Sequence, residues 1–261
     1  MYNGADSIEE QYSIFLCEKQ GVYRMIDTVL FDLDGTLLPM DMDVFLRSYL
    51  GGLARRVAPV CGYDPKALVA GIMAGTEAMI RNDGKKSNED VFWDAFEARF
   101  APKDVRGDMP HFDAFYREDF DRVAEVCGRD PRAIAAVREL KRRGYRVILA
   151  TNPLFPAVAT EARIRWAGLE PEDFEFCTTY ENSCHCKPNP AYYRDVLDRA
   201  GVSPERCIMV GNDTSDDVAA EKLGIPVFLI TACLYDRERK DISGYPQGDF
   251  DDLLAYLGER E

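Results

Sequence analysis

The sequence predicts an α/β protein: a doubly wound, Rossmann-like parallel sheet core with an inserted all-helical cap domain. Three observations support this fold class. Short apolar, β-branched runs alternate with segments of helical spacing, which is typical of βαβ units. The interval from residue 40 to residue 129 holds helical patterns and no convincing strand. The length of 261 residues exceeds that of a usual single core and suits one domain with a substantial insertion.

The core elements are expected in alternation along the chain. Apolar runs predict strands over residues 26–31, 146–150, 174–178, 207–210 and 227–230. Helical spacing, often opened by proline and closed near glycine, predicts helices over residues 131–143, 156–166, 190–200 and 216–223. The core domain would comprise residues 26–39 and 130–261, preceded by an N-terminal extension over residues 1–25.

The insertion over residues 40–129 is expected to form a four-helix cap domain. Phe92, Phe96 and Phe100 illustrate its pattern, because they lie on one stripe of a helix. The predicted helices cover residues 43–60, 64–81, 87–100 and 111–127.

The composition narrows the class of protein. A net charge of −14 opposes phosphate backbones, so nucleic acid is not an expected partner. No apolar run approaches the roughly 18 residues that indicate a membrane span. The eight cysteines are scattered, and the first residues lack the basic start and apolar stretch of a secretory signal. We therefore expect a cytoplasmic protein with reduced thiols, and the sequence carries no signal for an oligomeric state.

Two carboxylates follow the first predicted strand. Asp32 and Asp34 are two positions apart, so both side chains can face one small volume beyond the strand. Gly35 permits a sharp turn, and the Thr36 hydroxyl can hold it. One acid can attack a substrate while the other handles protons.

Polar groups also follow two later strands, and in open parallel sheets this is the edge where ligands bind. Thr151 and Asn152 offer a hydroxyl, an amide and backbone donors after the second strand. Lys187 precedes a helix opened by proline, and its ammonium can offset the charge of an approaching phosphate.

An acidic stretch follows the strand over residues 207–210. Asp213 and Asp217 are spaced i,i+4, so they would share one face at the start of a helix. Asp216 is expected to point elsewhere and to serve the first helical turn. Carboxylate oxygens are the ligands that Mg²⁺ prefers.

These motifs resemble those of the haloacid dehalogenase (HAD) superfamily. Asp32-x-Asp34-Gly35-Thr36 resembles the first motif, and Thr151 and Lys187 match the second and third. The stretch over residues 211–217 resembles the fourth, except that an asparagine separates the glycine from the acid. The resemblance spans roughly residues 26–230, and the helical insertion resembles the smaller, C1 class of cap.

The resemblance implies a Mg²⁺-dependent phosphatase of the HAD phosphatase branch. Asp32 would attack phosphorus and form an aspartyl phosphate, while Asp34 would act first as acid and then as base. Thr151, Asn152 and Lys187 would bind the phosphate group.

The implied metal ligands are Asp32, the main-chain carbonyl of Asp34, and Asp213. Asp217 is a fourth candidate, which would hold a metal-bound water or orient Lys187 instead. The expected partner is a small phosphorylated metabolite, with a sugar phosphate or nucleotide monophosphate as the default.

Two other functions stay open. A phosphomutase of the same superfamily would use the same two acids, and a HAD-like binding protein would lack turnover. Relatives that cleave carbon–halogen bonds lack an acid at the position of Asp34, so dehalogenation is disfavoured.

In the insertion, candidate substrate contacts are Arg47, Tyr49, Lys85 and Lys86.

Overall fold

Five parallel strands form the centre of the protein, whose computed structural model describes residues 26–259. The strand order is β2-β1-β3-β4-β5. The α/β, doubly wound class predicted from the sequence is confirmed. The strands are β1 (Thr28–Phe31), β2 (Arg146–Leu149), β3 (Cys207–Gly211), β4 (Val227–Ile230) and β5 (Gln247–Gly248).

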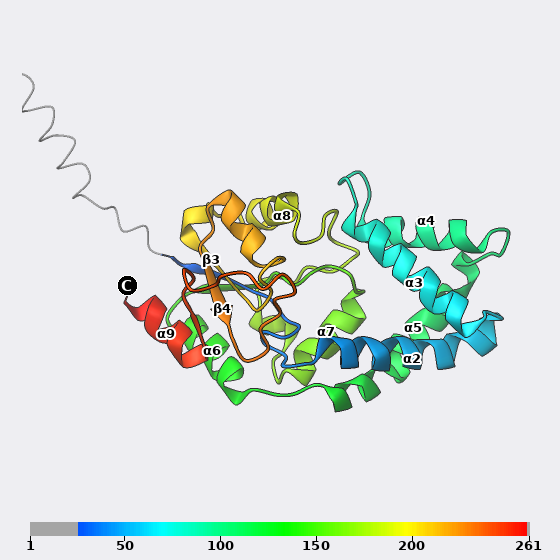
Figure 1. Ribbon diagram of the computed structural model, residues 1–261, viewed down its shortest axis with the longest axis horizontal. Coiled ribbons are helices and arrows are strands. Elements are labelled where there is room, and N and C mark those ends of the chain that lie inside the picture. The colour runs from blue at the N-terminus through cyan, green and yellow to red at the C-terminus, as the bar shows by residue number, and fades with distance from the viewer. Residues whose placement is uncertain (1–25, 260–261) are drawn as a thin grey trace, which may run out of the picture.

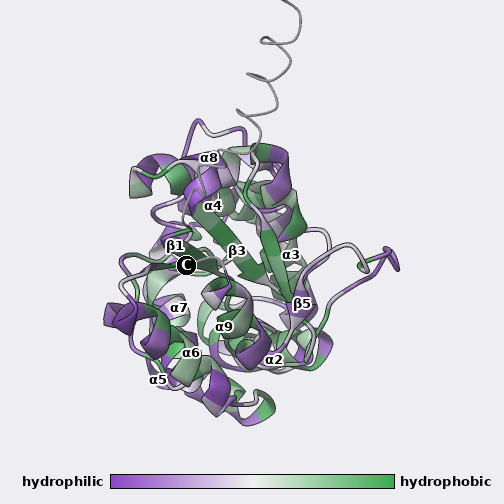
Figure 2. Cartoon of the chain, turned by 90° about the vertical axis from the view of Figure 1, so that its left-hand side faces the viewer, coloured by the Kyte–Doolittle hydropathy of each residue, from purple (hydrophilic) through white to green (hydrophobic). Residues whose placement is uncertain are grey.

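The first strand lies inside the sheet and aligns its neighbours. Phe31, at the end of β1, is paired with Leu149 of β2 on one side and with Val210 of β3 on the other. Every residue of β1 is buried, as expected of a parallel sheet covered on both faces. Figure 2 shows this apolar interior in the green of β1 and β3. The three carboxyl ends therefore meet at one edge.

Helices cover both faces of the sheet (Figure 1). On one face α8 (Pro190–Ala200) and the 3-10 helix η5 (Val218–Leu223) pack over Leu30. On the other, α6 (Pro131–Arg142) and α9 (Phe250–Gly258) pack over Val29 and Phe31. The remaining helix of the core is α7 (Ala157–Trp166), and short 3-10 turns lie at η3 (Pro171–Asp173) and η4 (Pro204–Arg206).

All elements between β1 and α6 are helical. Gly71 and Gly75 let the helix over Pro65–Ile80 approach the next helix, Asn88–Phe100, closely. A Cβ on Gly71 would lie 2.5 Å from the Phe100 ring, and one on Gly75 would lie 2.5 Å from Phe92. The helices are α2 (Met42–Cys61), α3 (Pro65–Ile80), α4 (Asn88–Phe100), η1 (Arg106–Asp108), α5 (Met109–Glu118) and η2 (Phe120–Val126). We call Met42–Val126 the helical insertion; its division from the core at residues 40 and 129 stays a prediction.

The predicted strand over residues 174–178 is wrong. Glu175 N donates to Val147 O at 2.8 Å, but Leu149 forms its bridge with Cys177. The segment thus carries one extra residue opposite β2, and this bulge interrupts the ladder.

Two predicted helices are shorter than expected. The helix over residues 111–127 stops at Glu118 and continues as the 3-10 helix η2, which places Phe120 against Trp166 of α7. The helix over residues 216–223 is a 3-10 helix that starts at Val218, because the Asp213 side chain holds the preceding backbone in a turn. The sequence reading also missed β5 and α9.

The predicted N-terminal extension, residues 1–25, lies outside the described residues. Within residues 26–259, no helix is both long and apolar enough to span a membrane.

Candidate active site

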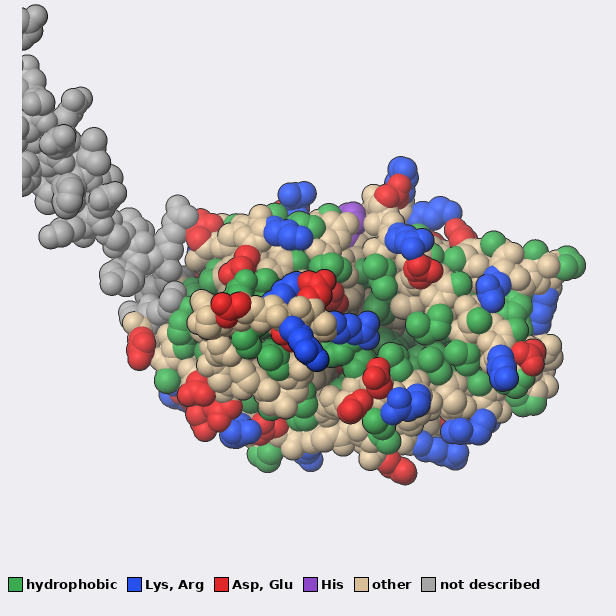
Figure 3. Space-filling view, in the orientation of Figure 1, with side chains coloured by type: hydrophobic (Ala, Val, Ile, Leu, Met, Phe, Trp, Pro, Cys, Tyr) green, Lys and Arg blue, Asp and Glu red, His purple; other side chains and the backbone are tan. Residues whose placement is uncertain are grey.

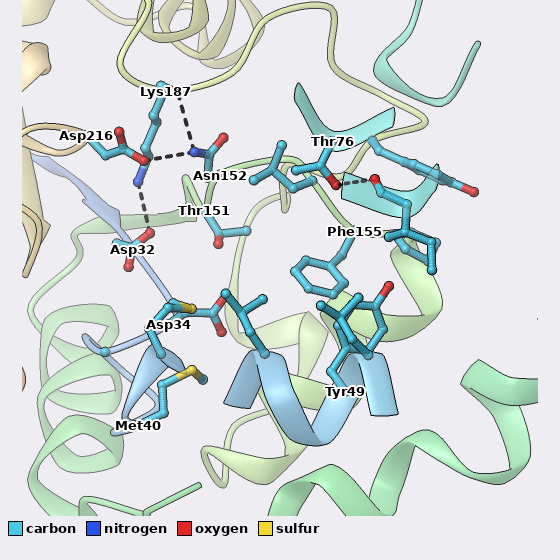
Figure 4. A pocket seen from close by; sticks show the side chains of 18 of the residues that line it. Asp32, Asp34, Met40, Tyr49, Thr76, Thr151, Asn152, Phe155, Lys187 and Asp216 are labelled. Carbon is cyan, nitrogen blue, oxygen red and sulfur yellow. Dashed lines mark hydrogen bonds and ion pairs between the residues drawn. The ribbon is translucent and has the colours of Figure 1, made fainter. Parts of the chain in front are cut away.

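The carboxyl edge of the sheet opens into a cavity of about 300 Å³. Asp32 enters it from the end of β1, Thr151 from the end of β2 and Asp213 from the turn after β3. Lys187 reaches it from the loop before α8. Figure 4 shows Asp32, Lys187 and Asp216 close together on one side of this cavity. The structure therefore brings together residues predicted from four separate stretches of sequence.

A buried lysine lies between two aspartates. Lys187 Nζ is 2.9 Å from Asp32 Oδ1 and 2.7 Å from Asp217 Oδ1, and its side chain is 1% exposed. The Thr36 hydroxyl lies 3.2 Å from Asp32 Oδ2 and 3.0 Å from Asn212 Oδ1. Asp32 is thus fixed by one ammonium and one hydroxyl at the base of the cavity.

Burial dominates the electrostatics of this cluster. It raises the pKa of Asp32 to about 7, against the lowering effect of Lys187 and with a further raising effect of Asp217 and Asp34. For Lys187, burial favours the neutral form, but the charges of Asp217 and Asp32 outweigh it and hold the pKa well above its ordinary value. Lys187 therefore stays cationic at neutral pH.

Asp217 positions Lys187. Its Oδ2 accepts the backbone N–H groups of Asn212 and Asp213, both at 2.9 Å, while Oδ1 accepts from the lysine. The carboxylate lies so close to β3 that a Cβ on Gly211 would be 2.1 Å from Oδ2, which explains the glycine at this position. Of the two roles predicted for Asp217, this geometry favours the orientation of Lys187.

The expected direction of Asp216 is wrong. Its side chain lines the cavity, and its Oδ2 accepts from Asn152 Nδ2 at 2.9 Å. The reason is local: Asp213 Oδ1 accepts the N–H groups of Ser215 and Asp216, so the chain turns here instead of entering an α-helix. Burial raises the pKa of Asp216 to about 6 and also raises the pKa of Asp213.

Thr151 and Asn152 both line the cavity, as predicted. The main-chain oxygen of Thr151 accepts hydrogen bonds from the hydroxyls of Thr178, at 2.6 Å, and Tyr192, at 2.9 Å. These bonds hold the end of β2 in place. Asn152 donates to Asp216, whereas its buried Oδ1 has no protein partner among the described residues. It is available to a donor on a ligand.

Arg163 is a residue of the site that the sequence reading missed. It is fully buried on α7, and its Nη1 forms an ion pair with Asp34 Oδ2. Its Cζ lies 4.1 Å from the centre of the Phe155 ring, and its Nε donates to Ala159 O at 3.2 Å. One signal was present: Arg163 shares a helical stripe with the buried residues Ala159, Thr160 and Ile164. An arginine on an apolar stripe indicates a buried partner.

We expect Arg163→Leu to lower kcat by about 10- to 100-fold, because Asp34 loses the contact that fixes its carboxylate. The loss should be larger for phenyl phosphate than for p-nitrophenyl phosphate, whose leaving group needs little protonation. Steady-state kinetics with both esters measure this difference.

Arg165→Leu is the matched control, since Arg165 lies on the same helix but is 51% exposed. It should leave both rates unchanged. Equal losses for both esters in Arg163→Leu would contradict a role through Asp34.

The candidate contacts in the helical insertion separate into two groups. Tyr49 lines the cavity. Lys85 and Lys86 instead pair with Asp83, at 2.6 Å, and Asp94, at 2.8 Å, and neither lines the cavity. Arg47 is exposed and also lies outside the lining. Only Tyr49 remains a candidate in this structure.

The oxygens at the sheet edge fit a divalent cation. Among the described residues of the lining, the Lys187 ammonium is the one cation near four aspartates of the site: Asp32, Asp213, Asp216 and Asp217. Burial raises the pKa of the first three. A hard cation offsets such a surplus of buried negative charge. No three His, Cys, Asp or Glu side chains within residues 26–259 are grouped to hold a metal by themselves. Main-chain oxygens and water molecules would complete the coordination shell, which suits Mg²⁺ because this ion commonly keeps several water ligands.

Fold and site together define an α/β enzyme with a buried aspartate as its candidate nucleophile. The family model of haloacid dehalogenase-like hydrolases matches residues 26–224. The chain belongs to this family. The resemblance predicted from the four motifs is thereby confirmed.

Two similar proteins carry phosphatase names. The chain is 29% identical over 242 residues to a phosphoglycolate phosphatase of Rhodospirillum rubrum, with 90% of each chain covered. It is 27% identical over 213 residues to pyrophosphatase PpaX of Bacillus cereus, covering 81% of this chain and 86% of that protein. These names agree with the predicted phosphatase branch.

Solved structures show the same fold. A HAD phosphatase from Thermococcus onnurineus has a TM-score of 0.56 at 19% identity, covering 89% of this chain and 98% of that one. CbbY from Rhodobacter sphaeroides, solved with phosphate, has a TM-score of 0.55 at 22% identity, covering 90% of this chain and all (100%) of the other.

Proposed function

We propose that the protein is a Mg²⁺-dependent phosphatase that hydrolyses a small phosphate monoester through an aspartyl phosphate. One observation carries the proposal: Asp32 is held at the base of a cavity by Lys187 and Thr36, with Asp34 two residues further on in the same lining. This arrangement supports the proposal, because two-step phosphoryl transfer requires a nucleophile, a cation and a second acid close together.

In the first step, a carboxylate oxygen of Asp32 attacks phosphorus and the bond to the ester oxygen breaks. Asp34 gives its proton to the leaving alcohol. In the second step, Asp34 takes a proton from water, which attacks the aspartyl phosphate and releases inorganic phosphate. Arg163 holds Asp34 beside the reacting atoms in both steps.

Three further residues bind and neutralise the phosphate. Lys187 supplies a fixed positive charge next to Asp32, and Asp217 keeps its ammonium there. Thr151 and Asn152 offer a hydroxyl and an amide at the same end of the cavity. Mg²⁺, held by Asp32, the Asp34 main-chain carbonyl and Asp213, would offset the repulsion between phosphate and carboxylates.

We expect hydrolysis of p-nitrophenyl phosphate in Mg²⁺ and a loss of at least about 100-fold in EDTA, because the metal contributes several kcal/mol of charge stabilisation. The release of p-nitrophenolate measures the rate of hydrolysis under both conditions. Restoring Mg²⁺ should restore the rate.

Full activity in EDTA would contradict the metal requirement. Absence of hydrolysis, with phosphoryl transfer appearing only when a bisphosphate is added, would indicate the phosphomutase alternative. Mg²⁺ binding with neither reaction would indicate a binding protein.

A further inference from the structure

We propose that the alcohol part of the substrate is an uncharged, apolar alkyl or aryl group that occupies the half of the cavity formed by the helical insertion. The inference rests on the proposed function, because it concerns the ester that the same site would hydrolyse. It names a substrate class that the motifs at the sheet edge do not specify.

The cavity has two chemically different ends. One end holds the carboxylates and Lys187, and the other is lined by large hydrophobic side chains. Figure 3 shows a hollow walled by hydrophobic side chains between charged rims, and Figure 4 places Tyr49 and Phe155 across from Asp32. Each main helix of the insertion contributes to the apolar half: Leu46, Leu50 and Leu53 from α2, Ile72 from α3, Phe92 from α4 and Phe112 from α5.

Three hydroxyl groups in this half, those of Tyr49, Tyr116 and Thr76, already have partners, and the one buried donor of the described lining without a partner is Trp93 Nε1. Tyr49 and Tyr116 form a hydrogen bond with each other at 2.7 Å, and Thr76 donates to the main-chain oxygen of Ile72 at 3.0 Å. Burial raises the pKa of Tyr49 to about 12, so the phenol stays neutral. A sugar with several hydroxyls would lose its water and gain few new bonds here, which is costly.

The charges around the cavity oppose a second anionic group on the substrate. Lys187 is the only cation among the described residues of the lining, and it is already paired with Asp32 and Asp217. Asp113 lies in the lining on the insertion side. Arg237 stacks on Tyr235, 4.8 Å from the ring centre, but is not itself part of the lining. Inside the cavity, a carboxylate or second phosphate would therefore meet carboxylates, and the one cation of the described lining is already paired.

This substrate class differs from the sugar phosphate or nucleotide expected from the sequence. Periodicity showed that the insertion is helical, but it did not show which faces turn toward the catalytic end. Burying an apolar group against Leu50, Ile72 and Phe92 releases water from both surfaces, which is favourable in proportion to area.

Calorimetric titration of the full chain in Mg²⁺ with methyl-, butyl- and hexylphosphonate tests the proposal without turnover. Affinity should rise by up to about fourfold per added methylene, the factor that corresponds to burying one CH₂ group, until the cavity is full. Phosphonoacetate, which carries a carboxylate instead, should bind more weakly than hexylphosphonate.

A pair of variants on α2 locates the binding. Leu50→Gln puts an amide in the apolar lining. The affinity for hexylphosphonate should fall about tenfold, as expected for an unpaired buried polar group, while the affinity for methylphosphonate should stay within about twofold of the wild-type value. Val60→Gln is the control, because Val60 is 61% exposed and outside the lining. It should change neither affinity.

Equal affinity for all chain lengths, or tighter binding of phosphonoacetate than of hexylphosphonate, would overturn the inference. A failure of the proposed function would be distinguishable from a failure of this inference. If the protein binds hexylphosphonate preferentially but hydrolyses no ester, the apolar site stands and the proposed activity fails. One that hydrolyses p-nitrophenyl phosphate without any gain from chain length retains the activity and loses the apolar site.

Discussion

Asp32→Asn should lower kcat for p-nitrophenyl phosphate by at least about 10³-fold, since an amide cannot form the aspartyl phosphate. The fold should survive, because Lys187 keeps its contact with Asp217 at 2.7 Å. Burial raises the pKa of Asp32 from 3.8 to about 7, so ionising this carboxyl costs stability as the pH rises between these values, and the full cost is present at pH 8. In EDTA at pH 8, the Tm of the variant should therefore be equal to or higher than that of the wild type.

Asp43→Asn is the control for this variant, because Asp43 is an exposed acid in the first turn of α2. It should retain the wild-type rate. If Asp32→Asn kept more than a tenth of the activity, Asp32 would not be the nucleophile and the proposed mechanism would fail.

Lys187→Met is expected to have the largest effect on stability. Removing the ammonium leaves Asp32 and Asp217 buried without their shared cation, which costs about 3 to 5 kcal/mol of the free energy of unfolding. Denaturant unfolding followed by circular dichroism, in EDTA, measures this cost. Activity should be lost as well, because no cation then faces the phosphate.

Two comparisons separate charge from packing. Adding Asp217→Asn to Lys187→Met removes one of the stranded carboxylates and should recover part of the lost stability. Lys141→Met removes a lysine that is 39% exposed and should change stability by less than about 0.5 kcal/mol. A Lys187→Met protein as stable as the wild type would contradict the proposed balance of charges.

Much of the core could be predicted because its signals are local. Within residues 26–31 only Asp27 and Thr28 are polar, and the run from Val29 to Phe31 is apolar and β-branched or bulky. Such runs form buried parallel strands. Asp32, Thr151 and Lys187 follow strands or precede a helix, and the sheet brings those positions to one edge. Each of these predictions needed only a short stretch of sequence and the general geometry of parallel sheets.

The errors have equally specific causes. The strand over residues 174–178 fails because one extra residue opposes β2, and a bulge leaves no mark in the hydrophobic pattern. Asp216 was misplaced because the i,i+4 reasoning assumed an α-helix, whereas the Asp213 side chain holds a turn. Side-chain to backbone bonds of this kind compete with helix formation.

Local pattern in the chain is enough to establish the parallel sheet, the helical insertion and the residues that follow each strand, because side-chain alternation and turn chemistry act over a few positions. The partners of those residues depend on contacts between distant segments. Arg163 meets Asp34 across 129 positions, and Lys187 meets Asp32 across 155. The apolar half of the cavity likewise exists only where four helices converge with the sheet edge, so packing, not sequence pattern, sets the chemistry that the site offers to a substrate.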